Sequence, residues 1–153
     1  MKCGLVYDLF LEKHRTGSGH PEQPVRASHV YREIEKAGLL PKTLKINPKA
    51  CREETLALAH DSTYLAQAKK DILEGLSVLS TGDTQVCRDS WEVARRATGG
   101  VLLAVDQVMN GPIKRAFCLT RPPGHHATPS KGMGFCIFNH IAIAAKYAQK
   151  KHG

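Results

Sequence analysis

The sequence lacks any apolar run approaching the roughly 20 residues that a membrane span requires. Near the N-terminus, a charge at Asp8 comes too early to leave room for the apolar region of a signal peptide. Acidic residues are few, since 14 Asp and Glu stand against 22 Lys and Arg, and the formal net charge is +8. Such an excess favours acidic partners or surfaces without identifying one. We therefore expect a soluble intracellular protein, cytoplasmic or (in a eukaryote) nuclear, with no membrane partner.

Cysteine pairs at metal-binding or redox spacing are also lacking. The five cysteines are odd in number, lie far apart and include no C-x-x-C pair. A secreted disulfide framework usually has an even number of cysteines in a shorter chain, so reduced thiols are expected. There are no internal repeats, low-complexity tracts or evident linkers. The 153 residues, 42% of them hydrophobic and 24% charged, predict one folded domain with an ordinary core.

Hydrophobic periodicity predicts short strands that alternate with helices. The expected strands lie at residues 3–7, 42–46 and 116–119, and the expected helices at 25–37, 53–59, 62–74, 90–109 and 139–150. Ahead of the longest helix, Asp89 and Glu92 have the spacing of a capping box. The alternation predicts an α/β fold with a parallel sheet flanked by helices. Ligands of such sheets bind outside the carboxyl ends of the strands.

The loop after the third expected strand, residues 120–136, is therefore the first place to look for chemistry. It holds three prolines, three glycines and the adjacent pair His125 and His126. Histidine titrates near neutral pH and is the usual general base and metal ligand. Adjacent side chains of a regular strand point to opposite faces, so only irregular backbone directs both imidazoles into one cavity. We predict that arrangement here; the alternative is two solvent-exposed loop histidines without a chemical role.

Two segments of this region, RPPGHHA at 121–127 and GFCIFN at 134–139, closely resemble the signature of the histone deacetylase family. The resemblance is nearest to the class II branch and to the acetylpolyamine amidohydrolases. Residues 19–26 resemble the family's N-terminal loop, residues 60–65 its second helical motif, and residues 82–84 its rim loop. The motifs follow one another in the family's order from about residue 5 to residue 147.

The resemblance implies the arginase/deacetylase fold and a zinc-dependent amide hydrolase. Its substrates would be acetylated lysine side chains of peptides or acetyl-polyamines. His126 would act as general base and then general acid, and His125 as its electrostatic partner. Cys136 is expected to be a small buried residue rather than a nucleophile. His140 departs from the Asn or Asp that is common at this place in the family, and no role is assigned to it.

Four further residues match positions of the family that contact substrate or product. Gly134 and Phe135 match the wall of a narrow tunnel that holds the apolar acyl-lysine chain. Asp83 matches a rim carboxylate that hydrogen-bonds the substrate backbone. Arg26 matches an arginine of the internal channel by which acetate leaves. Without the resemblance, three of these residues have purely structural interpretations. Phe135 could be a core residue, Asp83 a turn residue and Arg26 a solvated charge on a helix.

The family's zinc ligands and its transition-state Tyr or His lie beyond the position that matches Gly153. The resemblance therefore predicts that residues 1–153 are the N-terminal portion of a single, truncated deacetylase domain. On their own they should bind no stoichiometric Zn²⁺ and show no activity, and the missing C-terminal half of the domain would be their partner. A parallel sheet cut open after about its third strand would leave an apolar edge and face uncovered, so the chain is also predicted to be loosely packed or to self-associate, with a homo-oligomer as one outcome.

Two functions of other classes stay open at this point. The chain could be a non-catalytic fragment or pseudoenzyme that acts as a binding or assembly partner. It could also be a small structural-zinc protein whose ligands are Cys118, His125 or His126, Cys136 and His140, with the last two sharing a helical face. Direct binding of nucleic acid is not expected, because the basic residues are dispersed and no recognition motif is present.

Overall fold

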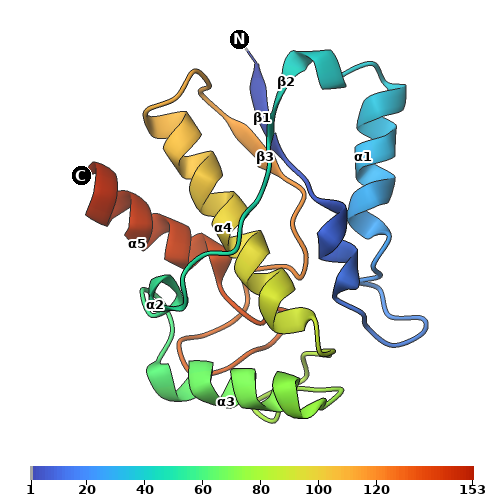
Figure 1. Cartoon of the computed structure of the whole chain (residues 1–153), viewed down its shortest axis with the longest axis vertical. Coiled ribbons are helices and arrows are strands. Elements are labelled where there is room, and N and C mark those ends of the chain that lie inside the picture. The colour runs from blue at the N-terminus through green and yellow to red at the C-terminus, as the bar shows by residue number, and fades with distance from the viewer. Residues whose placement is uncertain (1) are drawn as a thin grey trace.

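A three-stranded parallel sheet forms the centre of the computed structural model, which describes residues 2–153 (Figure 1). The strands β1 (Cys3–Val6), β2 (Thr43–Ile46) and β3 (Ala116–Cys118) lie in the order β2-β1-β3. In this register Val6 of the central strand is opposite Ile46 on one side and Cys118 on the other. The predicted α/β fold with a parallel sheet is confirmed, and all three strands lie where the hydrophobic pattern places them.

Helices connect the strands and continue beyond the sheet. They are α1 (Arg26–Lys36), α2 (Glu53–Leu56), α3 (Ser62–Glu74), α4 (Ser90–Met109) and α5 (His140–His152), with 3-10 turns η1 (Leu9–Lys13) and η2 (Leu40–Lys42). All five predicted helices are present, although α2 is shorter than its pattern indicates. The two 3-10 turns were not predicted, because a single turn leaves no repeating apolar stripe.

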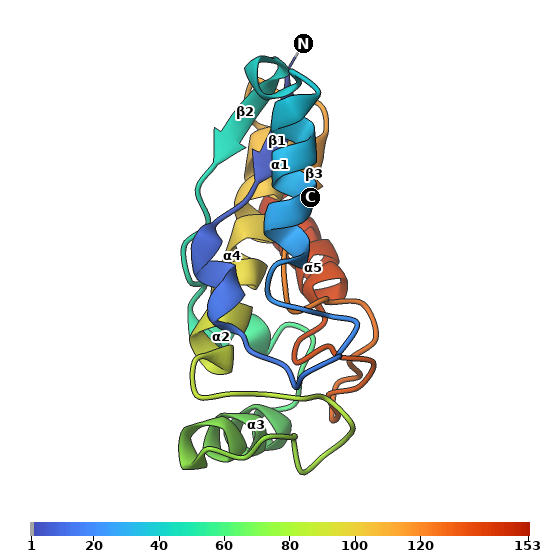
Figure 2. The ribbon, with the colours of Figure 1, turned by 90° about the vertical axis from the view of Figure 1, so that its right-hand side faces the viewer.

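The sheet is covered on both faces, as a parallel sheet requires. Leu5 faces α1, where it packs with Ala27 and with Leu119 after β3. Its neighbour Val6 points the other way, toward α4, and packs with Ala104. Figure 2 shows α1 in front of β1 and α4 behind it. The two helices therefore fix the orientation of the sheet whose carboxyl ends lead to the candidate site.

The start of α4 differs from the prediction. Asp89 precedes the helix, but its backbone is already helical (φ −81°, ψ −12°) and its side chain makes no capping hydrogen bond. An N-cap side chain reaches the first helical amides from an extended backbone, so this geometry rules the cap out. Glu92 instead accepts a hydrogen bond from Arg95 at 3.1 Å. The predicted capping box is therefore wrong, although the helix begins at the predicted residue.

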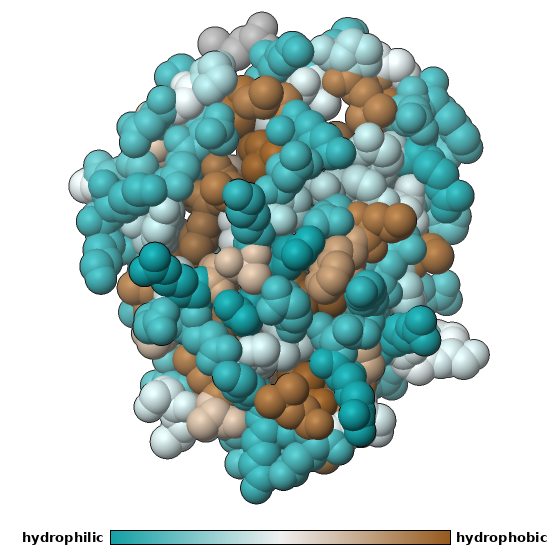
Figure 3. Space-filling model, viewed as in Figure 1, coloured by the Kyte–Doolittle hydropathy of each residue, from teal (hydrophilic) through white to brown (hydrophobic). Residues whose placement is uncertain are grey.

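One side of the molecule presents apolar groups to solvent. A shallow groove of about 340 Å³ lies between α4, β3 and α5, and Val101, Val105 and Val108 of α4 are among its lining residues. Phe117 lies between the groove-lining Ala116 and Cys118 of β3, so it points to the opposite face of the sheet, where it is half exposed. The face seen in Figure 3 is mostly hydrophilic, with hydrophobic patches between the charged side chains. Within residues 2–153, every helix is too short or too polar to span a membrane.

Candidate active site

The loop that leaves β3 is anchored by a buried arginine. Arg121 has no solvent exposure, and its guanidinium donates to both carboxylate oxygens of Glu22, at 3.1 and 2.8 Å. The same group donates to the carbonyl oxygens of Leu11 and His14, at 2.8 and 2.6 Å. Bidentate pairing of this kind fixes geometry as well as adding energy. The start of the loop is therefore held against residues 11–22, far away in the sequence.

The buried His14 contacts the same Arg121–Glu22 pair and also the start of α4. His14 Nδ1 lies 2.7 Å from Ser90 Oγ at the start of α4, and its Nε2 lies 3.9 Å from the Glu22 carboxylate. Burial, followed by the positive charge of Arg121, lowers the pKa of His14 to about 3. His14 is therefore neutral near pH 7, and Arg121 is the buried cation that balances Glu22.

The two adjacent histidines lie side by side at the surface of this loop. The ring centroids of His125 and His126 are 4.2 Å apart, the rings are inclined by 53°, and both side chains are exposed. His125 also lines a cavity of about 580 Å³ beneath the loop, whereas the lining residues of that cavity do not include His126. The two imidazoles thus lie together, but the prediction that both line one cavity holds for His125 alone, because the exposed His126 ring lies against Gly134 instead.

The backbone beneath the pair is fixed by a cysteine and a glycine. Cys136 is fully buried, as predicted, and its sulfur lies 3.4 Å from the backbone nitrogens of His125 and His126, both of which donate to it. Gly134 has a positive φ of 57°, and a Cβ built there would lie only 2.8 Å from the His126 imidazole. A glycine at this position therefore lets the His126 ring rest directly against the chain.

Asp83 and Phe135 lie at the outer edge of the same site. The exposed carboxylate of Asp83 accepts a hydrogen bond from the Gly134 N–H at 3.2 Å. The ring of Phe135 is 36% exposed and meets His20 edge-on, with centroids 4.5 Å apart. Sequence reasoning gave His20 no role of its own; its only signal was membership of the segment that resembles the N-terminal loop. Three separate segments thus converge around the histidine pair.

Arg26 lies at the cavity beneath the loop. Its Nε donates to the Glu22 carboxylate and its Nη2 to the Thr120 carbonyl, both at 3.2 Å. The cavity of about 580 Å³ is lined by Arg26, His125 and His140 among others. The structure therefore brings a guanidinium and an imidazole of the predicted site together around one hollow. Glu22 also lines this cavity, and its carboxylate pairs with the Arg26 guanidinium there.

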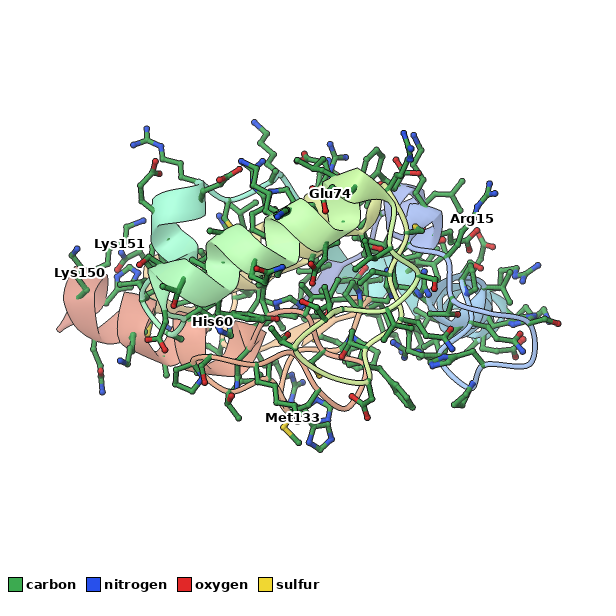
Figure 4. The ribbon with its side chains drawn as sticks, turned by 90° about the horizontal axis from the view of Figure 1, so that it is seen from below. Arg15, His60, Glu74, Met133, Lys150 and Lys151 are labelled. Carbon is green, nitrogen blue, oxygen red and sulfur yellow. The ribbon has the colours of Figure 1, made fainter. Side chains whose placement is uncertain are left out.

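The far end of the loop is held by a second buried histidine. His60 Nε2 accepts the N–H of Asn139 at 2.8 Å, and the Asn139 side chain caps α5 by accepting the Ala142 N–H at 3.0 Å. Burial lowers the pKa of His60, which keeps Nε2 available as an acceptor. In Figure 4 His60 lies close to the start of α5, while Met133 marks the outer edge of the loop. Both ends of the loop are thus fixed.

The described residues do not assemble a zinc site. In residues 2–153 no three His, Cys, Asp or Glu side chains gather closely enough to hold a metal ion. Catalytic zinc normally has three protein ligands, so this part of the chain does not supply the set. The structural-zinc alternative also lacks support. The ring nitrogens of His140 face Thr98 and Pro122, and the Cys136 sulfur faces loop amides.

The site thus consists of paired imidazoles on a loop with a buried anchor, at the edge of a parallel sheet between helices. Comparisons with known proteins show the family to which this arrangement belongs. The sequence matches the histone deacetylase domain over residues 20–153, and the chain belongs to the histone deacetylase family. The HD domain of HDA15, known from a crystal structure, superposes with a TM-score of 0.89 at 30% identity. That match covers 99% of this chain and 44% of that one, and it confirms the arginase/deacetylase fold.

Several curated proteins are similar to the chain over most of its length. Histone deacetylase 6 of Caenorhabditis elegans is 34% identical over 87% of this chain and 15% of its own. Polyamine deacetylase HDAC10 of Homo sapiens is 32% identical over 86% of this chain and 20% of its own. The uncharacterized protein slr0245 of Synechocystis is 37% identical over 97% of this chain and 49% of its own. The chain spans less than half the length of each of these relatives.

Proposed function

We propose that this chain supplies the proton-transfer, tunnel-wall and rim residues of a zinc-dependent deacetylase, which hydrolyses the N-acetyl amides of lysine side chains or of polyamines. The observation that carries the proposal is the pair of exposed imidazoles 4.2 Å apart on a loop fixed by fully buried Arg121. Membership of the histone deacetylase family supports the reaction class. The similarity to a polyamine deacetylase supports including small acetylated amines among the substrates.

In this proposal the histidine pair manages the protons of amide hydrolysis. His126 accepts a proton from the water whose oxygen attacks the acetyl carbonyl carbon. As the C–N bond breaks, His126 returns that proton to the amine nitrogen, which gives the amine and acetic acid. The acid then loses the second proton of the water, so that acetate leaves and the amine becomes protonated near pH 7. His125 provides a second polar ring beside the charge that develops on His126. The family is zinc-dependent, and we assign the zinc ligands to polypeptide outside residues 2–153.

The residues around the histidine pair are assigned contacts with the substrate or the product, according to where they lie. Phe135 and Gly134 form a wall beside His126, where an apolar acyl chain is shielded from water. Asp83 presents its second carboxylate oxygen to the N–H groups of a bound peptide, while its first holds the Gly134 N–H. Arg26 lies at the cavity that His125 lines, and its positive charge favours acetate as the departing anion.

The rest of a deacetylase domain is the partner that this proposal requires. β3 is an edge strand, and the apolar groove beside it lies open along α4 and α5. An edge strand presents unpaired backbone N–H and C=O groups, which makes this edge suitable for further strands. Without that partner the exposed apolar groups favour self-association. We place the protein in the cytoplasm, or in the nucleus of a eukaryote.

The test is complementation by the unmatched part of a relative. The chain is expressed alone and together with the part of slr0245 that lies outside the matched region, which is about half of that protein. Zinc content and turnover of an acetyl-lysine peptide and of an acetyl-polyamine are then measured for each preparation. We expect the pair of polypeptides to bind one zinc ion and to release acetate, and the chain alone to do neither.

Matched histidine variants serve as controls in the complemented enzyme. His126→Ala should abolish turnover while zinc remains bound, and His29→Ala, an exposed position on α1, should leave turnover unchanged. Assembly of the two polypeptides with zinc but without release of acetate would contradict the proposed hydrolysis. It would favour a binding or assembly role instead.

A further inference from the structure

His140, the first residue of α5, is a buried polar side chain that the proposed reaction does not use. It is 2% exposed and lies between α4 and the loop that carries the tandem histidines. Its Nδ1 is 2.9 Å from the Thr98 hydroxyl of α4, and its Nε2 is 3.3 Å from the Pro122 carbonyl. The ring therefore connects the longest helix to the backbone three residues before His125.

The chemistry of the two neighbours determines which ring nitrogen carries the proton. A carbonyl oxygen can only accept, so the bond to Pro122 requires a hydrogen on Nε2. Nδ1 of the neutral ring is then an acceptor. The Thr98 hydroxyl has a single hydrogen and two acceptors within reach, Nδ1 at 2.9 Å and the Ala94 carbonyl at 3.0 Å. With Nε2 protonated that hydrogen points to Nδ1, since the ring nitrogen would otherwise face an oxygen with no hydrogen between them. Burial is the main cause that lowers the pKa of His140 to about 4; the Pro122 hydrogen bond opposes this shift, and the nearby His60 and His125 add to it. The ring is therefore neutral across the physiological range.

The ring also presses directly on the backbone next to His125. At Gly124 any Cβ would overlap the His140 ring, so only a glycine fits between them. The carbonyl of Gly124 accepts the N–H of Ile141, at 3.1 Å, in the first turn of α5. Two hydrogen bonds and one close packing contact thus connect the start of α5 to residues 122–124.

We propose that His140 is a positioning residue for the tandem histidines. Its Nε2–H bond to Pro122, together with its packing on Gly124, sets the direction in which His125 leaves the loop. The ring keeps the His125 imidazole at the mouth of the cavity that both residues line. The catalytic consequence rests on the proposed function. The effect on the loop does not, so it can be measured in the chain without any turnover.

The experiment uses nuclear magnetic resonance on the isotope-labelled 153-residue chain. In the unaltered chain, the His140 ring should be protonated on Nε2 and unprotonated on Nδ1 throughout pH 5.5–8. A ring protonated on Nδ1 would overturn the proposal without any variant being made. A cross-relaxation signal between the rings of His125 and His126, whose centroids are 4.2 Å apart, reports the direction of His125.

Three variants then distinguish the effect of the hydrogen bond to Pro122 from the effect of the ring's packing against Gly124. His140→Phe keeps a ring against Gly124 but donates nothing, so the signal between the two rings should disappear. Exchange of the His125 and His126 amide hydrogens should become about tenfold faster in that variant. His140→Gln retains an N–H donor and should restore both readouts to within about twofold of the unaltered chain. Ile46→Ala, on β2, which β1 separates from the strand that leads to the loop, lowers stability without changing a loop residue and should leave the ring signal intact.

The outcomes that would overturn the positioning role of His140 differ from the one that would support it. Unchanged readouts in His140→Phe would overturn it, as would failure of His140→Gln to restore them. Equal acceleration of exchange in Ile46→Ala would also overturn it, because protection of the loop would then reflect global unfolding rather than the His140 bond. Loss of the ring signal in His140→Phe alone would support the positioning role, even in a protein that turned out to lack deacetylase activity.

Discussion

The buried and the exposed histidines of this chain make an instructive comparison. His14 and His140 lie inside, and burial lowers their pKa values to about 3 and about 4, so each is a neutral hydrogen-bond partner with a fixed orientation. His60, also buried, holds the start of α5. His125 and His126 are exposed, and their rings face each other. Histidine therefore has two roles in this chain. The three buried histidines hold the loop in place, and the exposed pair is available for proton transfer.

The largest expected effect comes from breaking the buried anchor of the loop. Arg121→Met should lower the free energy of unfolding by about 3–5 kcal/mol, because it leaves the Glu22 carboxylate buried without its principal cation. Urea denaturation followed by circular dichroism measures this loss. Lys36→Met, which removes an exposed ion pair with Glu33, is the control and should leave the unfolding midpoint unchanged. A loss in Arg121→Met as small as that in the control would show that the loop does not depend on its anchor.

Acid should destabilise the chain through its buried histidines. The folded-state pKa values of His14 and His140, about 3 and about 4, lie below the unfolded value of about 6.5. The unfolded chain therefore binds more protons, and stability that is fully present above pH 6.5 is lost as the pH falls toward 4. His140→Phe should flatten the dependence of the urea midpoint on pH between 7 and 5, whereas Ile46→Ala should lower the midpoint equally at both. An unchanged slope in His140→Phe would mean that His140 is not held neutral.

The thiol beneath the histidine pair should have a smaller effect. Cys136→Ala removes the acceptor of two loop amides, and a buried donor left without a partner costs about 1–3 kcal/mol. Cys136→Ser keeps an acceptor at nearly the same place and should lose less stability. Urea midpoints of the two variants, compared side by side, measure the difference. Equal losses would indicate that packing of the sulfur, rather than its hydrogen bonds, supports the loop.

The last expected effect concerns the choice of substrate and leaves the stability of the fold unchanged. In the complemented enzyme, Asp83→Ala should reduce kcat/KM for an acetyl-lysine peptide about tenfold more than for a free acetyl-polyamine, since a hydrogen bond to a charged acceptor is worth about 1.5–3 kcal/mol. Asp83→Asn keeps an oxygen for the Gly134 N–H and loses only the charge, which separates loop support from peptide binding. Equal reductions for both substrates would remove the peptide-gripping role of Asp83.

Local pattern predicts the elements of this fold well. The β1 and β2 strands are short runs with β-branched residues, and α4 carries a long apolar stripe, so periodicity alone locates them. The loop with His125 and His126 could also be found, because proline, glycine and adjacent histidines mark it without reference to distant residues. The structure adds that only His125 of this pair lines the cavity.

What the sequence could not predict depends on contacts between distant segments. Arg121 reads as an ordinary charged residue within a motif, yet its partner Glu22 lies 99 positions earlier. An arginine is rarely buried completely, so composition argues against such a pair until the fold brings the partners together. His140 is similar: its neighbours Thr98 and Pro122 come from α4 and the loop, and no local spacing signals either contact.

The central claim is that the exposed histidines perform the chemistry and the buried ones hold the loop. It is tested most directly by kcat for acetyl-lysine peptide turnover in the complemented enzyme, measured alongside zinc content. General acid–base catalysis contributes about 10²–10⁴-fold, so His126→Ala should lower kcat by that factor with zinc still bound, whereas His140→Gln should stay close to the unaltered enzyme. Turnover by His126→Ala at the unaltered rate, with a full complement of zinc, would contradict the account.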